Sequence, residues 1–150
     1  MKLWRICRAP FQDLNGEGAK LHGGRWNSER IPVVYLSTTL ALAAMEYLVQ
    51  LDVRTAPSDL VAIELVAPDD LSREEIAPHA LLADWNVVSD HPRCVDLGDE
   101  WARRGEAALL FVPSAVIPNS WNVLLNPLHA ERARVTHTTE PFVFDRRLLE

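Results

Sequence analysis

Four polar residues, Arg25, Tyr35, Glu46 and Ser114, each stand alone inside a glycine-rich or apolar segment. A guanidinium, a phenol, a carboxylate and a hydroxyl can bind phosphates, stack on rings and stabilise developing charge. Such groups are costly to bury without a partner. We therefore expect all four side chains to face one shared, partly buried pocket.

Arg25 follows Gly23 and Gly24, and two interpretations of this turn are open. Most charged side chains are solvated, so Arg25 could be an exposed arginine beside a tight turn, with Trp26 packed in the core. The glycines also allow backbone N–H groups to approach a phosphate, and a guanidinium can bind its oxygens in a bidentate manner. The second interpretation makes this turn an anion-binding site.

Glu46 has the best support from physical chemistry alone. We expect Ser37 or Thr38 to cap a helix that runs to about Leu51 without internal proline or glycine. Apolar residues occupy every face of this helix, which predicts that it is buried. Its one carboxylate must then be paired, hydrogen-bonded or next to a cleft. An ion pair with an arginine such as Arg25 is the alternative, and such a pair could also preorganise the site.

Ser114 and Tyr35 carry weaker signals. The segment Val-Pro-Ser-Ala lacks the G-x-S-x-G pattern of a serine nucleophile, and no histidine lies near it in the sequence. A hydroxyl at the end of a strand usually bonds the local backbone, so the pattern alone gives Ser114 no role as a nucleophile. A tyrosine in an apolar strand is more often a core residue than a functional one.

The remaining pattern predicts more strands than helices. Strands are expected over residues 3–8, 32–37, 60–66, 107–112 and 121–125, with a terminal strand or hairpin within 135–144. A second helix is expected over 94–106, interrupted by Gly98, whereas 16–24 is predicted to be a loop and 68–92 a lid-like region with short helical pieces. Because helices and strands do not alternate regularly, the fold class is α+β rather than doubly wound α/β.

Length and composition fit one domain over residues 1–150, with 48% hydrophobic and 24% charged residues, as in soluble proteins. The formal net charge of -6 and the lack of a basic cluster argue against a nucleic-acid surface. Cys7 and Cys94 are far apart, and the histidines show no metal spacing, so we expect no metal site and a reduced, cytoplasmic setting. Arg5 and Arg8 interrupt the first apolar residues, which predicts no signal peptide, and no segment is long enough for a membrane span.

Several short motifs follow one another in a recognisable order. They are Gly23-Gly24-Arg25-Trp26-Asn27, Tyr35, Glu46, Val112-Pro113-Ser114-Ala115 and Asn126-Pro127-Leu128-His129. From about Gly16 to about His129, the chain resembles the RES-domain toxins of bacterial toxin–antitoxin modules, named for an arginine, a glutamate and a serine. One departure is Ser28-Glu29-Arg30, where family members often have a glycine.

The resemblance implies an ADP-ribosyltransferase-like fold, with small, mostly antiparallel sheets around an NAD cleft. It implies that NAD is the substrate rather than a bound cofactor, and that the bond between nicotinamide and ribose is broken. Arg25 would clamp the pyrophosphate, and Tyr35 would stack on or orient the nicotinamide side. Glu46 would stabilise an oxocarbenium-like transition state, and Ser114 would fix the reactive conformation. The expected NAD-binding residues are Arg25, Tyr35, Gly24, Trp26, Asn27 and Ser114.

Two other functions stay open at this point. ADP-ribosyl transfer to a protein would use the same NAD site and differ only in the acceptor. A non-catalytic module that binds NAD or an antitoxin is the alternative from another class. The resemblance further implies a homodimeric toxin and a cognate Xre-type antitoxin, whose helix-turn-helix part binds DNA and which blocks the active site.

Overall fold

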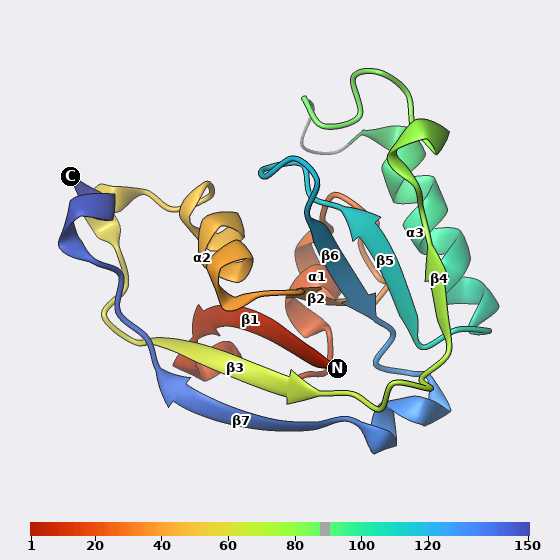
Figure 1. The fold of residues 1–150 in the computed structure, drawn as a ribbon, viewed down its shortest axis with the longest axis horizontal. Coiled ribbons are helices and arrows are strands. Elements are labelled where there is room, and N and C mark those ends of the chain that lie inside the picture. The colour runs from red at the N-terminus through yellow and green to blue at the C-terminus, as the bar shows by residue number, and fades with distance from the viewer. Residues whose placement is uncertain (88–90) are drawn as a thin grey trace.

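A computed structural model describes residues 1–87 and 91–150, in which the chain forms seven strands and three α-helices (Figure 1). The helices are α1 (Glu17–His22), α2 (Leu40–Leu48) and α3 (Pro92–Arg104). The strands are β1 (Lys2–Arg8), β2 (Val34–Ser37), β3 (Leu60–Val66), β4 (Arg73–Glu75), β5 (Leu109–Pro113), β6 (Trp121–Leu125) and β7 (Thr136–Pro141). Short 3₁₀ turns occur at Ala9–Phe11, Val53–Thr55, Pro78–Ala80, Ala130–Arg134 and Arg146–Leu149.

The seven strands form one sheet in the order β4-β5-β6-β2-β1-β3-β7. Only β4 and β5 pair in parallel, so the α+β, mostly antiparallel fold is confirmed. The two halves of the sheet are joined where β1 meets β2, and this junction has a single residue pair, Trp4 with Ser37. In contrast, β1 and β3 pair from Lys2–Val66 to Arg8–Leu60. The small sheets expected from the sequence are therefore joined into one.

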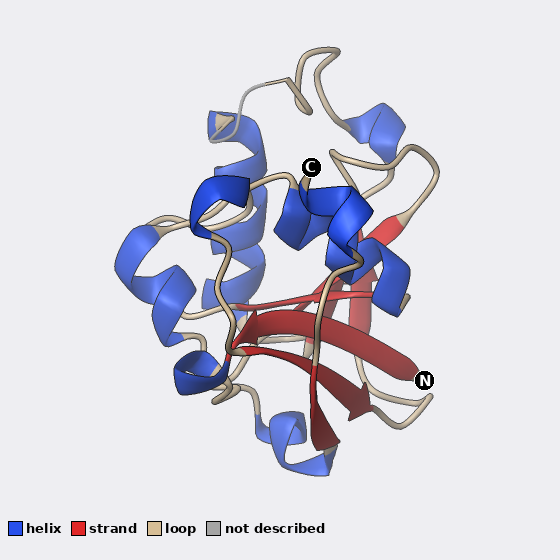
Figure 2. Ribbon diagram, turned by 90° about the vertical axis from the view of Figure 1, so that its left-hand side faces the viewer, coloured by secondary structure: helices blue, strands red, loops and turns tan. Residues whose placement is uncertain are grey.

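Alternating residues of the central strands fill two cores, because successive side chains in a strand point to opposite faces. Along β6, Val123 and Leu125 pack into one cluster with Leu3 and Ile63. Leu124 packs into the other cluster, which lies under α3 and contains Trp101. Figure 2 shows most of the helical segments gathered above the strands in that view.

Helix α2 begins one residue later than the sequence predicts. Thr39 is the N-cap, and its side chain accepts a hydrogen bond from the N–H of Leu42 over 3.1 Å. Ser37 stays in β2, and Thr38 donates its hydroxyl to the Trp121 carbonyl over 3.0 Å, so neither is available as a cap. The helix is also less buried than predicted, since Val49 at its C-terminal cap is 62% exposed.

Helix α3 runs without a break through Gly98, which corrects the expected interruption. The segment 16–24 contains α1 rather than only loop. The region 68–92 contains the edge strand β4 in addition to a short helical turn, and its residues 88–90 lie outside the described part. At the other edge, β7 pairs with β3 as a single strand, so the alternative of a terminal hairpin is not formed. Within the described residues, every helix is too short or too polar to cross a membrane.

Candidate active site

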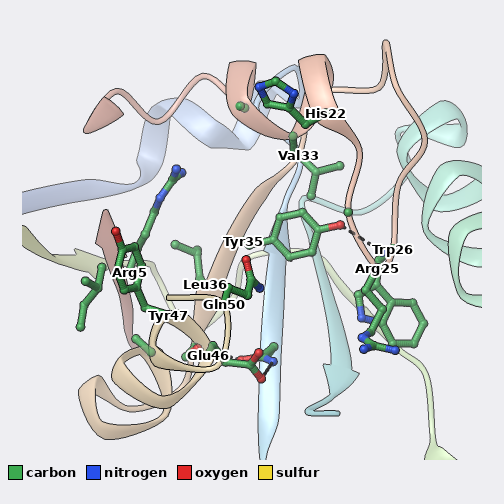
Figure 3. Close-up of a pocket in the computed structure, with 18 of the residues that line it drawn as sticks. Arg5, His22, Arg25, Trp26, Val33, Tyr35, Leu36, Glu46, Tyr47 and Gln50 are labelled. Carbon is green, nitrogen blue, oxygen red and sulfur yellow. Dashed lines mark hydrogen bonds between the residues drawn. The ribbon is translucent and has the colours of Figure 1, made fainter. Parts of the chain in front are cut away.

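A large cleft lies where β1 and β2 diverge from their single pair, and it has a volume of about 1160 Å³ (Figure 3). Arg5 of β1 and Tyr35 of β2 line it from the two strands. Glu46 of α2 and Arg25 of the glycine-rich turn complete the wall. Three of the four residues singled out in the sequence, Arg25, Tyr35 and Glu46, thus line one pocket. The fourth, Ser114, lies behind Glu46 and is not part of the cleft lining.

Glu46 is held by two neutral donors from the sheet. Ser114 Oγ donates to Glu46 Oε1 over 2.7 Å, and Asn122 Nδ2 donates to the same oxygen over 2.6 Å. The ion pair with Arg25 that the sequence left open is not formed between these two described residues. The carboxylate is therefore fixed at the cleft by two hydrogen bonds.

Ser114 lies directly after β5 and is 6% exposed. Its hydroxyl accepts the N–H groups of Val116 over 3.1 Å and Ile117 over 3.0 Å while it donates to Glu46. The proton and both lone pairs of this hydroxyl are thus in use. This arrangement suits a positioning group and leaves no lone pair for nucleophilic attack. Ser114 supports the carboxylate from behind, and the cleft itself is lined by its neighbours Pro113 and Ala115.

Arg25 extends from a turn that depends on its two glycines. Gly23 has φ +69, a left-handed conformation that favours glycine. A Cβ on Gly24 would lie 2.7 Å from the Tyr35 hydroxyl, so only glycine fits there. Arg25 Nη1 donates to the Trp85 carbonyl over 2.8 Å, and the side chain still lines the cleft. The turn therefore presents a held guanidinium to a ligand.

Tyr35 and Asn27 stabilise this turn from inside. The Tyr35 hydroxyl donates to Asn27 Oδ1 over 2.6 Å and accepts the Trp26 N–H over 3.0 Å. Asn27 Nδ2 reaches the carbonyls of Ala19 and Ile31, and the residue is 1% exposed. Burial raises the pKa of Tyr35, so its hydroxyl stays protonated. The ring of Tyr35 faces the cleft, whereas its hydroxyl and the Asn27 amide are used by the turn.

Helix α3 and Trp85, from the segment before it, support the same turn. Trp26 is 2% exposed and packs on Trp85 with ring centroids 6.1 Å apart. Asp99 accepts the Ser28 N–H over 2.9 Å and the Ser28 hydroxyl over 2.5 Å. Trp26 is thus a packing residue of the turn that also touches the cleft.

Sequence reasoning missed several polar residues that line this site, among them Arg5, Ser37 and Asn122. Asn122 lies between Trp121 and Val123 in an otherwise apolar strand. A single polar residue in an apolar segment is the same signal that identified Glu46. Arg5 lies in the middle of β1 and could have been found as a charge inside an alternating strand. Ser37 donates to Asn122 Oδ1 over 2.7 Å, and only the pairing of β2 with β6 shows this contact.

The site offers charges and hydrogen-bonding groups for an organic anion. Two arginines, Arg5 and Arg25, can meet phosphate oxygens, and Glu46 is a carboxylate on the wall of the same cleft. Within residues 1–87 and 91–150, no three His, Cys, Asp or Glu side chains come together as a possible metal site.

Fold and site together define an α+β protein whose split, mostly antiparallel sheet carries a fixed carboxylate and two arginines in one large cleft. The model of the RES domain family matches residues 2–145. The chain therefore belongs to the RES domain family.

Curated relatives match the chain over nearly its whole length. A Sphingobium protein named "Prs ADP-ribosylating toxin" is 32% identical, covering 97% of this chain and 95% of that protein. Two proteins named "Toxin Res" are 30% identical in Photorhabdus laumondii and 33% identical in Pseudomonas putida, covering at least 98% of every chain concerned. The fold resembles a chain in the crystal structure of the M. tuberculosis MbcT–MbcA toxin–antitoxin complex, with a TM-score of 0.78 at 18% identity, covering 94% of this chain and 83% of that one.

Proposed function

We propose that this protein is the toxin of a toxin–antitoxin pair and that it cleaves the bond between nicotinamide and ribose in NAD. The observation that carries the proposal is the Glu46 carboxylate, fixed on Oε1 at the wall of a cleft that also contains two arginines. The cleft is somewhat larger than the roughly 300–1000 Å³ of common small-molecule sites, as a dinucleotide requires. Kinship with the proteins named Toxin Res supports the biological role.

The chemistry needs little more than a placed negative charge. Nicotinamide leaves the ribose as a neutral molecule from a cationic pyridinium, so the leaving group needs no proton. Positive charge then develops on the ribose carbon and ring oxygen, as in glycoside hydrolysis. Glu46 stabilises this charge, directly or through a ribose hydroxyl, because a preorganised group costs no reorganisation during the reaction. Water or phosphate adds to the ribose carbon and completes the cleavage.

Other residues bind and orient the dinucleotide in this proposal. Arg25 holds pyrophosphate oxygens, and Arg5 supplies a second positive charge from the opposite strand. The Tyr35 ring stacks on the nicotinamide side, and Gly24 allows the turn to approach the ligand closely. Ser114, Asn27 and Trp26 act indirectly, since they hold Glu46 and the turn.

Purified protein without antitoxin should be incubated with NAD, and the products should be separated by liquid chromatography and mass spectrometry. We expect stoichiometric nicotinamide with free ADP-ribose, or its 1-phosphate if phosphate is the acceptor. Glu46→Gln should release at least about 100-fold less nicotinamide, because a preorganised charge is lost. Intact NAD after prolonged incubation with the folded wild-type protein would refute the proposal.

ADP-ribosyl transfer to a protein is the second candidate, favoured by the name of the Sphingobium relative, "Prs ADP-ribosylating toxin". It would use the same leaving group and the same carboxylate, but a protein side chain would replace water. NAD labelled in the adenylate part, added together with a cell extract, separates the two reactions. Label that becomes covalently bound to a protein supports transfer, and free labelled ADP-ribose supports hydrolysis.

An antitoxin partner is part of the proposal, since the structural neighbour comes from a toxin–antitoxin complex. We expect an Xre-type protein that covers the cleft of a cytoplasmic, homodimeric toxin and offers an anionic group to Arg25. Co-expression with the neighbouring reading frame should restore growth and yield a stable complex. NAD should compete with the blocking segment, so an unchanged NAD affinity in the intact complex would contradict occlusion.

A further inference from the structure

The two oxygens of the Glu46 carboxylate have different surroundings. Both donors, Ser114 Oγ and Asn122 Nδ2, converge on Oε1. In the part of the chain that the structure describes, no protein group donates a hydrogen bond to Oε2. Since Glu46 lines the cleft, Oε2 is the oxygen that remains available to a ligand.

The direction of each hydrogen bond around Asn122 is fixed by its neighbours. An ionised carboxylate can only accept, so Asn122 must turn its NH₂ group toward Glu46. Its Oδ1 then faces Ser37, whose hydroxyl lies 2.7 Å away and must donate. The reversed amide would place two acceptors 2.6 Å apart. Glu46 therefore sets the orientation of Asn122, and the Ser37 hydroxyl holds the amide in place from its Oδ1 side.

The sheet holds this network where its two halves meet. Ser37 pairs with Asn122 across β2 and β6, and it also forms the one pair between β2 and β1, with Trp4. Residues in one such row share a face of the sheet. The carboxylate is thus hydrogen-bonded to a residue of the sheet beside the junction of its two halves, while α2 supplies the backbone attachment of Glu46.

We propose that Asn122, held at its Oδ1 by the Ser37 hydroxyl, is a positioning residue for Glu46, and that Oε2 is the oxygen that contacts the ribose of the substrate. This inference rests on the NAD-cleaving function proposed above. It assigns the placement of the carboxylate to a residue outside the arginine, glutamate and serine of the family name. Loss of the Asn122 donor leaves Ser114 as the remaining donor to Oε1 and allows the carboxylate to rotate about that contact, so chemistry suffers more than substrate binding.

A double-mutant cycle tests this inference, with Asn122→Ala, Glu46→Ala and the double variant compared for nicotinamide release at high enzyme concentration. Asn122→Ala should lower kcat about 10- to 100-fold, the effect of losing one hydrogen bond to a charged group, with KM little changed. Asn122→Asp, which keeps the shape but repels Glu46, should lose at least as much. In the Glu46→Ala background, Asn122→Ala should cost almost nothing further. Asn119→Gly, in the exposed turn between β5 and β6, is the matched control and should keep wild-type kcat.

Additive losses in the cycle, a wild-type kcat in Asn122→Ala, or a loss confined to KM would each overturn the role of Asn122. A wild-type protein that releases no nicotinamide would instead refute the proposed function. In that case the Tm values of the same three variants and the wild type test the contact between Asn122 and Glu46. Coupled shifts in Tm support it, and independent shifts overturn it.

Discussion

Gly98 of α3 and Trp26 of the glycine-rich turn are in direct backbone contact. A Cβ at residue 98 would lie 1.7 Å from the Trp26 carbonyl oxygen and 2.7 Å from its carbonyl carbon. The next residue, Asp99, accepts two hydrogen bonds from Ser28. Helix α3 therefore determines where the turn places Arg25, through a position that admits no side chain.

Gly98→Ala should destabilise the protein and reduce NAD breakdown. Alanine is favoured over glycine inside a helix by roughly 0.5–1 kcal/mol, but here α3 must move away from backbone atoms that cannot yield. Gly18→Ala in α1 is the matched control, because a Cβ at Gly18 meets nothing within 4 Å. Thermal melts should show a lower Tm for Gly98→Ala and an equal or higher Tm for Gly18→Ala. A Gly98→Ala variant at or above the wild-type Tm would argue against the contact.

Local pattern was enough to predict most strands, because apolar runs bounded by turn residues are visible in the sequence. The strand at Trp121–Leu125 was predicted to the residue. The sequence analysis expected Gly98 to interrupt the helix, because glycine has a low helix propensity. The structure shows instead that glycine is required at this position by the close contact with the Trp26 backbone. The short β4 was missed because only its parallel pairing with β5 makes it a strand.

The candidate site was predictable to the extent that a lone polar residue in an apolar segment requires a partner. This reasoning predicted that Glu46 needs a hydrogen-bonding partner or a cleft, but the partner it named was Arg25, whereas the structure shows Ser114 at 2.7 Å. It could not find Ser37 as a partner of Asn122, since their contact depends on the register of β2 against β6. It also could not show that the Tyr35 hydroxyl is bound inside the turn.

Arg30 occupies the segment where family members often have a glycine, and its φ is +78. A left-handed conformation costs a residue with a Cβ about 1–2 kcal/mol. Arg30→Gly should therefore raise the Tm. The increase is reduced by the larger conformational entropy that glycine gives the unfolded chain. Asn119 has φ +59, but asparagine tolerates this region better, so Asn119→Gly should give a smaller change. An equal response of the two variants in thermal melts would show that strain at Arg30 is already relieved.

Tyr35→Phe should reduce both stability and activity. The change leaves Asn27 Oδ1 and the Trp26 N–H without their present partner, and an unpaired buried group costs about 1–3 kcal/mol. Because the ring remains, NAD breakdown should fall less than in Tyr35→Ala. Melts and NAD turnover of both variants test this. Wild-type stability in Tyr35→Phe would show that the hydroxyl does not support the turn.

Arg25→Ala should lower NAD breakdown on the order of 100-fold while the protein stays folded. Arg25→Lys should recover only part of this loss, because an ammonium cannot bind phosphate oxygens with a bidentate fork. Arg5→Ala should weaken NAD affinity from the opposite wall. Arg8→Ala is the control on the same strand, since Arg8 is exposed and pairs with Asp59. Full activity in Arg25→Ala would show that Arg25 does not bind the pyrophosphate of NAD.

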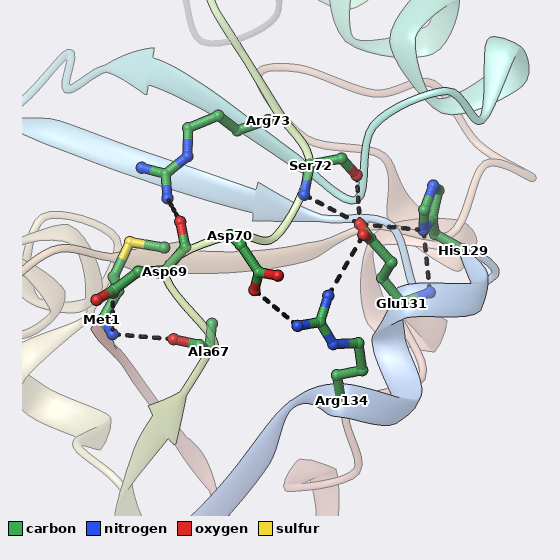
Figure 4. Close-up of polar contacts among 9 residues, drawn as sticks. All are labelled: Met1, Ala67, Asp69, Asp70, Ser72, Arg73, His129, Glu131 and Arg134. Carbon is green, nitrogen blue, oxygen red and sulfur yellow. Dashed lines mark hydrogen bonds and ion pairs between the residues drawn. The ribbon is translucent and has the colours of Figure 1, made fainter.

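Glu131 should make the stability of the protein depend on pH. Hydrogen bonds from the Ser72 hydroxyl and backbone N–H lower the pKa of Glu131 below 4.5, with smaller contributions from His129 and Arg134 (Figure 4). A carboxylate with a lowered pKa stabilises the fold above its ordinary pKa, and this contribution is lost as the pH falls through the folded-state value. Glu131→Gln should therefore lower the Tm at about pH 7, and the difference from wild type should shrink at pH values below about 4.5. A Tm difference for Glu131→Gln that stays constant across this pH range would mean that the charge of Glu131 does not support the contact with Ser72.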